Sequence, residues 1–209
     1  MTKKNLVKII IERLSKQYPL AECSLETQNP LELLIATRLS AQCTDARVNI
    51  VTPALFKRYP DAESFANADI TELEALVKTC GLYKTKAHDI KAMCQKLIDD
   101  FDGQVPDSMD SLLSLPGVGR KTANLVLGEI FHQSAVITDT HCIRLSNRMG
   151  LCDSKNPLKV ETALRRILPP GESTDFCHRL VHHGRAVCTA RKPDCDACTL
   201  NDICVKAGV

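Results

Sequence analysis

Apolar residues recur at every third or fourth position along most of the chain, and this helical spacing limits the possible folds more than any other feature. The clearest run covers four turns before Gly103 and consists of Ala87, Ile90, Cys94, Leu97, Ile98 and Phe101. No segment alternates apolar and polar residues over a strand's length, and no hairpin signal joins two such runs. The sequence therefore predicts an all-α protein of about ten short helices.

Several dipeptides mark expected helix ends. Asn29-Pro30 and Asn156-Pro157 each read as an N-cap followed by a first-turn proline. Gly81 is expected to stop the helix before it. Because proline inside a helix costs about 3 kcal/mol, Thr52-Pro53 is predicted to begin a new short helix.

Composition excludes some classes of protein and favours others. Hydrophobic residues make up 44% and charged residues 25%, which suits a chain with a packed core. No apolar run reaches the length of a membrane span, and residues 1–18 read as an amphipathic helix and not as a signal peptide. Residues 111–209 carry 13 Lys+Arg against 9 Asp+Glu, which weakly indicates an anionic partner.

The 11 cysteines divide into two groups. An odd number without a secretion signal favours a reducing compartment, so we expect free and mostly buried thiols at seven positions: Cys23, Cys43, Cys80, Cys94, Cys142, Cys152 and Cys177. The other four crowd the end of the chain as Cys188-x6-Cys195-x2-Cys198-x5-Cys204.

Four thiols so close together indicate a metal site. The spacing matches neither the paired knuckles of zinc sites nor the common ferredoxin runs, so zinc and iron–sulfur remain open at this point. Arg191 and Lys192 lie between the first two cysteines, where a loop fixed at both ends can present cations to phosphates.

A glycine-rich hairpin between two helices is expected at residues 114–123. Gly117 and Gly119 leave the backbone bare, so N–H groups at the start of the second helix can bind a phosphate without reading base sequence. An ordinary helical corner is the alternative.

Lys121 and Asp139 are the candidate reactive side chains. Lys121 opens the helix after the hairpin, beside Arg120; it is either a solvated lysine or a nucleophile, and a nucleophilic lysine must lose its proton. Asp139 stands in the segment Val136–His141, either as a helix cap or as a carboxylate that faces a developing positive charge.

Together these motifs resemble the endonuclease III family of helix–hairpin–helix DNA glycosylases. The resemblance spans nearly the whole chain and is carried, besides the four-cysteine tail, by residues 39–42 (LSAQ), 81–83 (GLY), 115–124 (LPGVGRKTAN), 139–141 (DTH) and 183–185 (HGR).

The resemblance implies an all-α fold of two helical lobes with a DNA groove between them. One lobe is expected to be a six-helix barrel at 22–132, with the helix–hairpin–helix at about 108–127. The other lobe would join 1–21 to 133–209 and hold a [4Fe–4S] cluster on Cys188, Cys195, Cys198 and Cys204.

The implied activity is base excision repair by a bifunctional DNA glycosylase and AP lyase. Such an enzyme removes oxidised pyrimidines from double-stranded DNA through a lysine Schiff base and cuts the strand 3′ to the abasic site by β-elimination. By matching motifs, Lys121 would be the nucleophile and Asp139 its carboxylate partner. We expect a monomer in a bacterial cytoplasm, associated with the nucleoid.

The resemblance also implies a set of DNA-contacting residues. Gln42 and Leu82 would fill the gap left by the extruded nucleotide. The other expected contacts are Gly117, Val118, Gly119, Arg120, Arg191 and Lys192. Whether His141 lines the lesion pocket is left open.

Two rival functions fit parts of the sequence. A monofunctional adenine glycosylase of the same superfamily would typically lack Lys121 and be longer. A zinc-stabilised DNA-binding module without activity would explain the cysteines and the hairpin, but not Lys121 and Asp139 together with Gln42 and Leu82.

Overall fold

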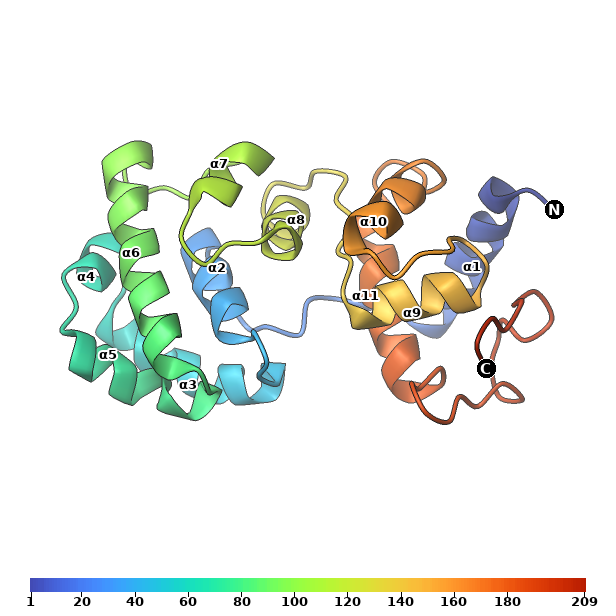
Figure 1. Cartoon of the computed structure of the whole chain (residues 1–209), viewed down its shortest axis with the longest axis horizontal. Helices are drawn as coiled ribbons and strands as arrows, with labels where there is room; N and C mark the ends of the chain where they lie inside the picture. The colour runs from blue at the N-terminus through green and yellow to red at the C-terminus, as the bar shows by residue number, and fades with distance from the viewer. The chain divides into compact units, whose positions relative to one another are not determined.

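The computed structural model describes all residues, 1–209, and contains helices and no β-strand (Figure 1). The chain divides into two compact units. One comprises Met1–Glu22 with His132–Val209, and the other is the continuous segment Cys23–Phe131. None of the helices is both long and apolar enough to cross a lipid bilayer.

The unit Cys23–Phe131 is organised around its longest helix, α6. One face of α6 is fully buried and carries Ala87, Ile90, Met93, Cys94 and Leu97. The short helix α4 packs closely against α6 (Figure 1). The elements of this unit are α2 (Pro30–Leu39), α3 (Asp45–Arg58), α4 (Ala62–Ala66), α5 (Ile70–Val77), the 3₁₀ turn η1 (Lys78–Cys80), α6 (Tyr83–Phe101), α7 (Met109–Ser114) and α8 (Arg120–Glu129).

The other unit joins the first helix to the last three. Helix α11 packs on both α1 and α9, and α10 packs on α9. Its core includes Val7, Leu145, Phe176 and Leu180, each at most 1% exposed. The helices are α1 (Lys3–Gln17), α9 (Thr140–Arg148), α10 (Pro157–Arg165) and α11 (Ser173–Ala186).

Helix starts follow the sequence signals closely. The Asn29 side chain accepts a hydrogen bond from Glu32 N, and Asn156 accepts one from Lys159 N, so both predicted Asn-Pro caps are confirmed. Gly81, with φ of 69°, follows η1 as the predicted stop. All seven scattered cysteines are free thiols, and five of them are buried.

The prediction of a helix start at Thr52-Pro53 is wrong. Helix α3 runs unbroken from Asp45 to Arg58, with Pro53 inside it. Proline removes one backbone hydrogen bond, but Val48, Thr52 and Leu55 lie on one buried face that spans the proline. Packing of that face outweighs the local cost, as tertiary contacts commonly do.

Candidate functional site

The predicted hairpin connects α7 to α8. Gly117 has φ of 73°, whereas Gly119 has φ of −100° and is the N-cap of α8. No side chain caps α8, and no acidic residue lies in its first turn. The first N–H groups of this helix are therefore not satisfied by a side-chain cap, as an anion site requires.

The two glycines serve different purposes. A Cβ atom on Gly117 would lie 2.8 Å from Arg38 Nε and 3.0 Å from Asp89 Cβ, so the hairpin rests directly on these residues. Arg38 Nε in turn donates to Asp89 Oδ2 at 2.9 Å. A Cβ on Gly119 would meet nothing within 4 Å. Gly117 is needed by the fold, whereas the space at Gly119 is open to a ligand.

We expect Gly117→Ala to lower the free energy of unfolding by about 1–3 kcal/mol, because it combines a positive φ with a steric clash. Gly119→Ala is the matched control and is expected to change stability by less than about 1 kcal/mol, since its φ suits alanine. Urea unfolding of both variants tests the difference. Equal stability of the two would show that the Arg38 contact does not constrain the hairpin.

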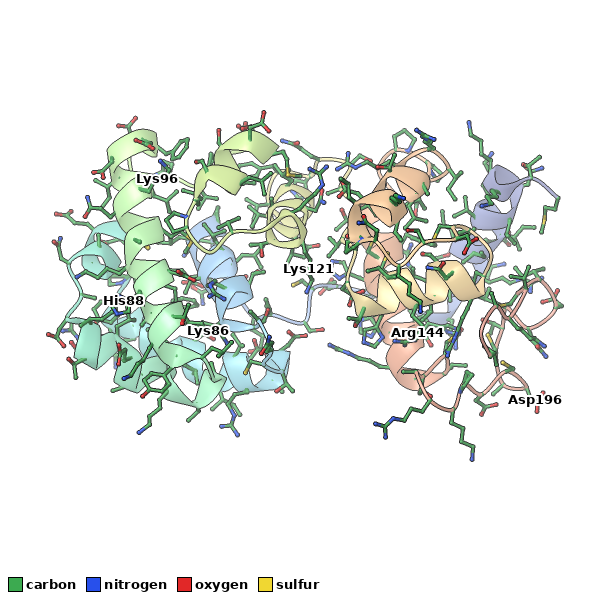
Figure 2. All side chains as sticks on the ribbon, viewed as in Figure 1. Lys86, His88, Lys96, Lys121, Arg144 and Asp196 are labelled. Atoms are coloured by element: carbon green, nitrogen blue, oxygen red, sulfur yellow. The ribbon has the colours of Figure 1, made fainter.

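Lys121 is the second residue of α8, and its side chain is exposed (Figure 2). It belongs to the unit Cys23–Phe131, together with Gln42 and Leu82. Both Gln42 and Leu82 are exposed and have left-handed backbones, with φ of 54° and 47°. Such conformations are uncommon for residues other than glycine and concentrate at functional sites.

Asp139 belongs to the other unit, where it is the N-cap of α9. Its Oδ1 atom accepts a hydrogen bond from Cys142 N at 2.7 Å, so the helix start holds the carboxylate in one orientation. The predicted capping geometry is thus present, and the cap leaves Oδ2 for other contacts. Nearby, Arg144 Nη2 lies 3.2 Å from His141 Nδ1.

The four tail cysteines surround one cavity, whose lining also includes Arg148, Pro193 and Asn201. They do not form disulfides. Burial raises the pKa of the Cys198 and Cys204 thiols, and the neighbouring thiols raise it further. Four thiolates would repel one another here without a compensating cation, so the donor set fits a thiolate-bound metal group.

Two residues for which the sequence predicted no part in the cysteine loop support it. Arg148 Nη1 donates to Cys188 Sγ at 3.3 Å and to Thr189 O at 2.7 Å. His183 is buried, and its Nε2 atom lies 3.4 Å from Cys198 Sγ. Arg148 follows Cys142 and Leu145 at a spacing of three, which could have placed it on the buried face of α9.

Arg191 and Lys192 are both exposed in the loop between the first two cysteines. Thr189 closes this loop from inside, because its Oγ1 atom donates to Lys192 O at 2.6 Å. The backbone of Asp194 donates to Val187 O at 3.0 Å and brings the two ends of the loop together. The loop therefore presents two cations on a fixed backbone.

Comparison with known proteins identifies the family. Residues 35–170 match the HhH-GPD superfamily of base excision DNA repair proteins, and residues 188–204 match the iron–sulfur binding domain of endonuclease III. The chain is 48% identical to endonuclease III of Synechocystis over 99% of its own length and 94% of the relative's. It is 41% identical to the Bacillus subtilis enzyme, with 95% and 91% covered.

A solved structure agrees with these matches. A trapped endonuclease III–DNA covalent intermediate superimposes with a TM-score of 0.93 at 42% identity, covering 99% of this chain and 97% of that one. The match of 188–204 to an iron–sulfur domain decides between the two metals that spacing left open. The chain therefore belongs to the endonuclease III family of HhH-GPD base excision DNA repair proteins.

Proposed function

We propose that Lys121 performs both reactions of this enzyme and that Asp139 assists it. Membership of the family makes the chain a base excision repair DNA glycosylase and AP lyase that carries an iron–sulfur cluster. A 42%-identical relative has been trapped as a covalent intermediate with DNA, which supports a covalent mechanism here. The observation that carries the assignment is an exposed lysine in the first turn of a helix that lacks a side-chain cap.

The hairpin is proposed to hold the DNA backbone. Backbone N–H groups at Gly119, Arg120 and Lys121 would donate to a phosphate, and the dipole of α8 favours the negative charge. Such contacts are blind to base sequence, which suits an enzyme that must find lesions in any context. The side chain of Val118, which is 9% exposed, is buried and anchors the hairpin turn to the protein.

Gln42 and Leu82 are proposed to stabilise the opened duplex. A damaged pyrimidine cannot be attacked within the base stack, so its nucleotide must rotate out at a cost of a few kcal/mol. The amide of Gln42 can hydrogen-bond the base left without a partner. Leu82 is 57% exposed, and its apolar side chain can replace the lost stacking.

The chemistry then proceeds on the extruded sugar. The neutral amine of Lys121 attacks C1′ and the bond to the damaged base breaks, with the electron pair leaving on the base. Loss of the lysine proton and opening of the sugar ring give a Schiff base. Its positive charge makes the C2′ proton acidic, and removal of that proton expels the 3′ phosphate by β-elimination.

Asp139 is proposed to stabilise the positive charge that develops on the sugar. A carboxylate fixed in orientation needs no rearrangement as this charge appears. We expect Asp139→Asn to lower the rate of base release by about 10²- to 10³-fold, since asparagine keeps the cap but not the charge. Single-turnover kinetics on thymine glycol DNA measure this rate of base release.

The control is Asp139→Ala, which also loses the hydrogen bond to Cys142 N and is expected to lower stability by about 1 kcal/mol more than Asp139→Asn. Retention of the wild-type rate by Asp139→Asn would leave Asp139 with a capping role alone.

The iron–sulfur cluster is proposed to be held by Cys188, Cys195, Cys198 and Cys204. When bound, it cross-links the end of the chain and supplies no step of the reaction. It would keep Arg191 and Lys192 in position to contact phosphates, a contact that we expect to weaken with salt. The division into a barrel lobe at 22–132 and a cluster lobe stays a prediction, as does action on nucleoid DNA in the bacterial cytoplasm.

Incubation with an end-labelled duplex that carries one thymine glycol tests the proposed function. The expected result is release of the base together with a strand cut 3′ to the lesion. Release of the base from an intact strand would mean a monofunctional glycosylase. An unmodified duplex of the same sequence is the control, and it should remain uncut.

A further inference from the structure

Lys86 is a buried basic residue that the proposed chemistry does not use. It has 0% exposed surface, although lysine is almost never fully buried without partners. Burial lowers the pKa of its amino group, while the neighbouring thiols Cys43 and Cys80 raise it. A buried amino group of this kind is retained only where hydrogen bonds compensate for the loss of water.

The compensating hydrogen bonds go to two separate segments of the backbone. The Nζ atom of Lys86 donates to Leu39 O and to Cys80 O, each at 2.8 Å. Leu39 is the last residue of α2, and Cys80 is the last residue of η1. Carbonyl groups at helix ends lack intrahelical donors and attract cations, so Lys86 caps two helices at once. Figure 2 shows it on α6.

These two segments lead directly to Gln42 and Leu82. Gln42 follows the end of α2, and Leu82 follows η1 through Gly81. The backbone N–H of Lys86 also donates to Leu82 O at 3.0 Å, so Lys86 holds the second segment at two points. Left-handed residues such as these keep their conformation only where the surroundings fix it.

We infer that Lys86 is a positioning residue that locks the loops of Gln42 and Leu82 to each other, so that both side chains enter the same gap in the duplex. This inference rests on the proposed function. It adds to that function a residue that supports the opening of the base stack. Without the amino group, two buried carbonyls lose their donors and the loops can move independently. The loss of Lys86 should therefore slow the reaction on duplex DNA, where the base stack must be held open, and not on single-stranded DNA.

The test compares Lys86→Met with Lys91→Met. Lys91 lies on the same helix, and its Nζ atom donates to Ala68 O at 2.6 Å, which is a similar bond outside the two loops. The rate of Schiff-base formation is measured on an abasic site in duplex DNA and in single-stranded DNA, which has no opposite stack. We expect Lys86→Met to lower the duplex rate, relative to the single-strand rate, by about tenfold or more. Lys91→Met should leave that ratio unchanged.

A double-mutant cycle provides the second readout. Leu82→Ala should slow the duplex reaction in the wild type and in Lys91→Met, but have little further effect in Lys86→Met, because the two residues act as a unit. If Lys86→Met does not melt cooperatively, Lys86→Gln replaces it. Glutamine keeps the buried site polar, but its amide lies on a shorter side chain than the amino group that reaches both Leu39 O and Cys80 O, so the duplex rate should still fall relative to the single-strand rate, by less than in Lys86→Met.

The inference would be overturned if Lys86→Met slowed the reaction equally on duplex and single-stranded DNA. It would also be overturned if the fold-reduction of the duplex rate in the double variant equalled the product of the fold-reductions in Lys86→Met and Leu82→Ala. Failure of the wild type to react with either abasic substrate is a different outcome. It would overturn the proposed function, and the inference with it.

Discussion

Replacing Lys121 by alanine is expected to abolish three activities: release of the damaged base, cleavage of the strand and covalent capture of DNA. Without the amine there is no nucleophile for C1′ and no Schiff base to acidify the C2′ proton. We expect the rate of strand cleavage to fall by about 10⁴-fold or more, as for loss of the nucleophile in other covalent enzymes. Gel analysis of an end-labelled thymine glycol duplex measures the loss.

Lys159→Ala is the matched control for this variant. Lys159 is also an exposed lysine in the first turn of a helix, α10, and no role is proposed for it. It should cleave at the wild-type rate. Both variants should melt at the wild-type temperature, because an exposed lysine contributes little to stability. Strand cleavage by Lys121→Ala at a rate near that of the wild type would remove Lys121 from the mechanism.

Replacing Cys198 by alanine is expected to release the cluster. The protein should lose its brown colour and nearly all of its iron, because three remaining thiolates cannot complete the four-cysteine ligand set. Metal binding is coupled to folding, so residues 188–204 should become accessible to protease. DNA affinity should fall by about tenfold or more as Arg191 and Lys192 lose their fixed positions.

Cys152→Ala is the control for the cluster variant. Cys152 is a buried free thiol of the same unit and is absent from the cavity that the four cysteines line. It should keep its iron and its colour. A full iron content in Cys198→Ala would mean that the ligand set is not the one proposed.

The sequence predicted helix ends well where one side chain decides them. Asn29, Asn156 and Asp139 each cap a helix by accepting a single backbone N–H bond, an interaction that depends only on neighbouring residues. It failed at Pro53, where burial of residues distant in the sequence outweighs the local cost of proline. Local signals are reliable until packing opposes them.

Some functional features depend on contacts that spacing cannot reveal. Lys86 lies on the same helical stripe as Ile90 and Leu97, which is the only sign in the sequence that it is buried. Its two acceptors are carbonyl groups, which every residue possesses, so the sequence does not mark them. The choice between zinc and iron–sulfur likewise needed the family match, because the cysteine spacing left both open.

The most direct test of the central claim is reduction by borohydride during reaction with a thymine glycol duplex, followed by protease digestion and mass spectrometry. Reduction turns the Schiff base into a stable amine link between protein and DNA. The account predicts one adduct, on the peptide that contains Lys121. An adduct on any other amine, or base release without an adduct, would contradict it.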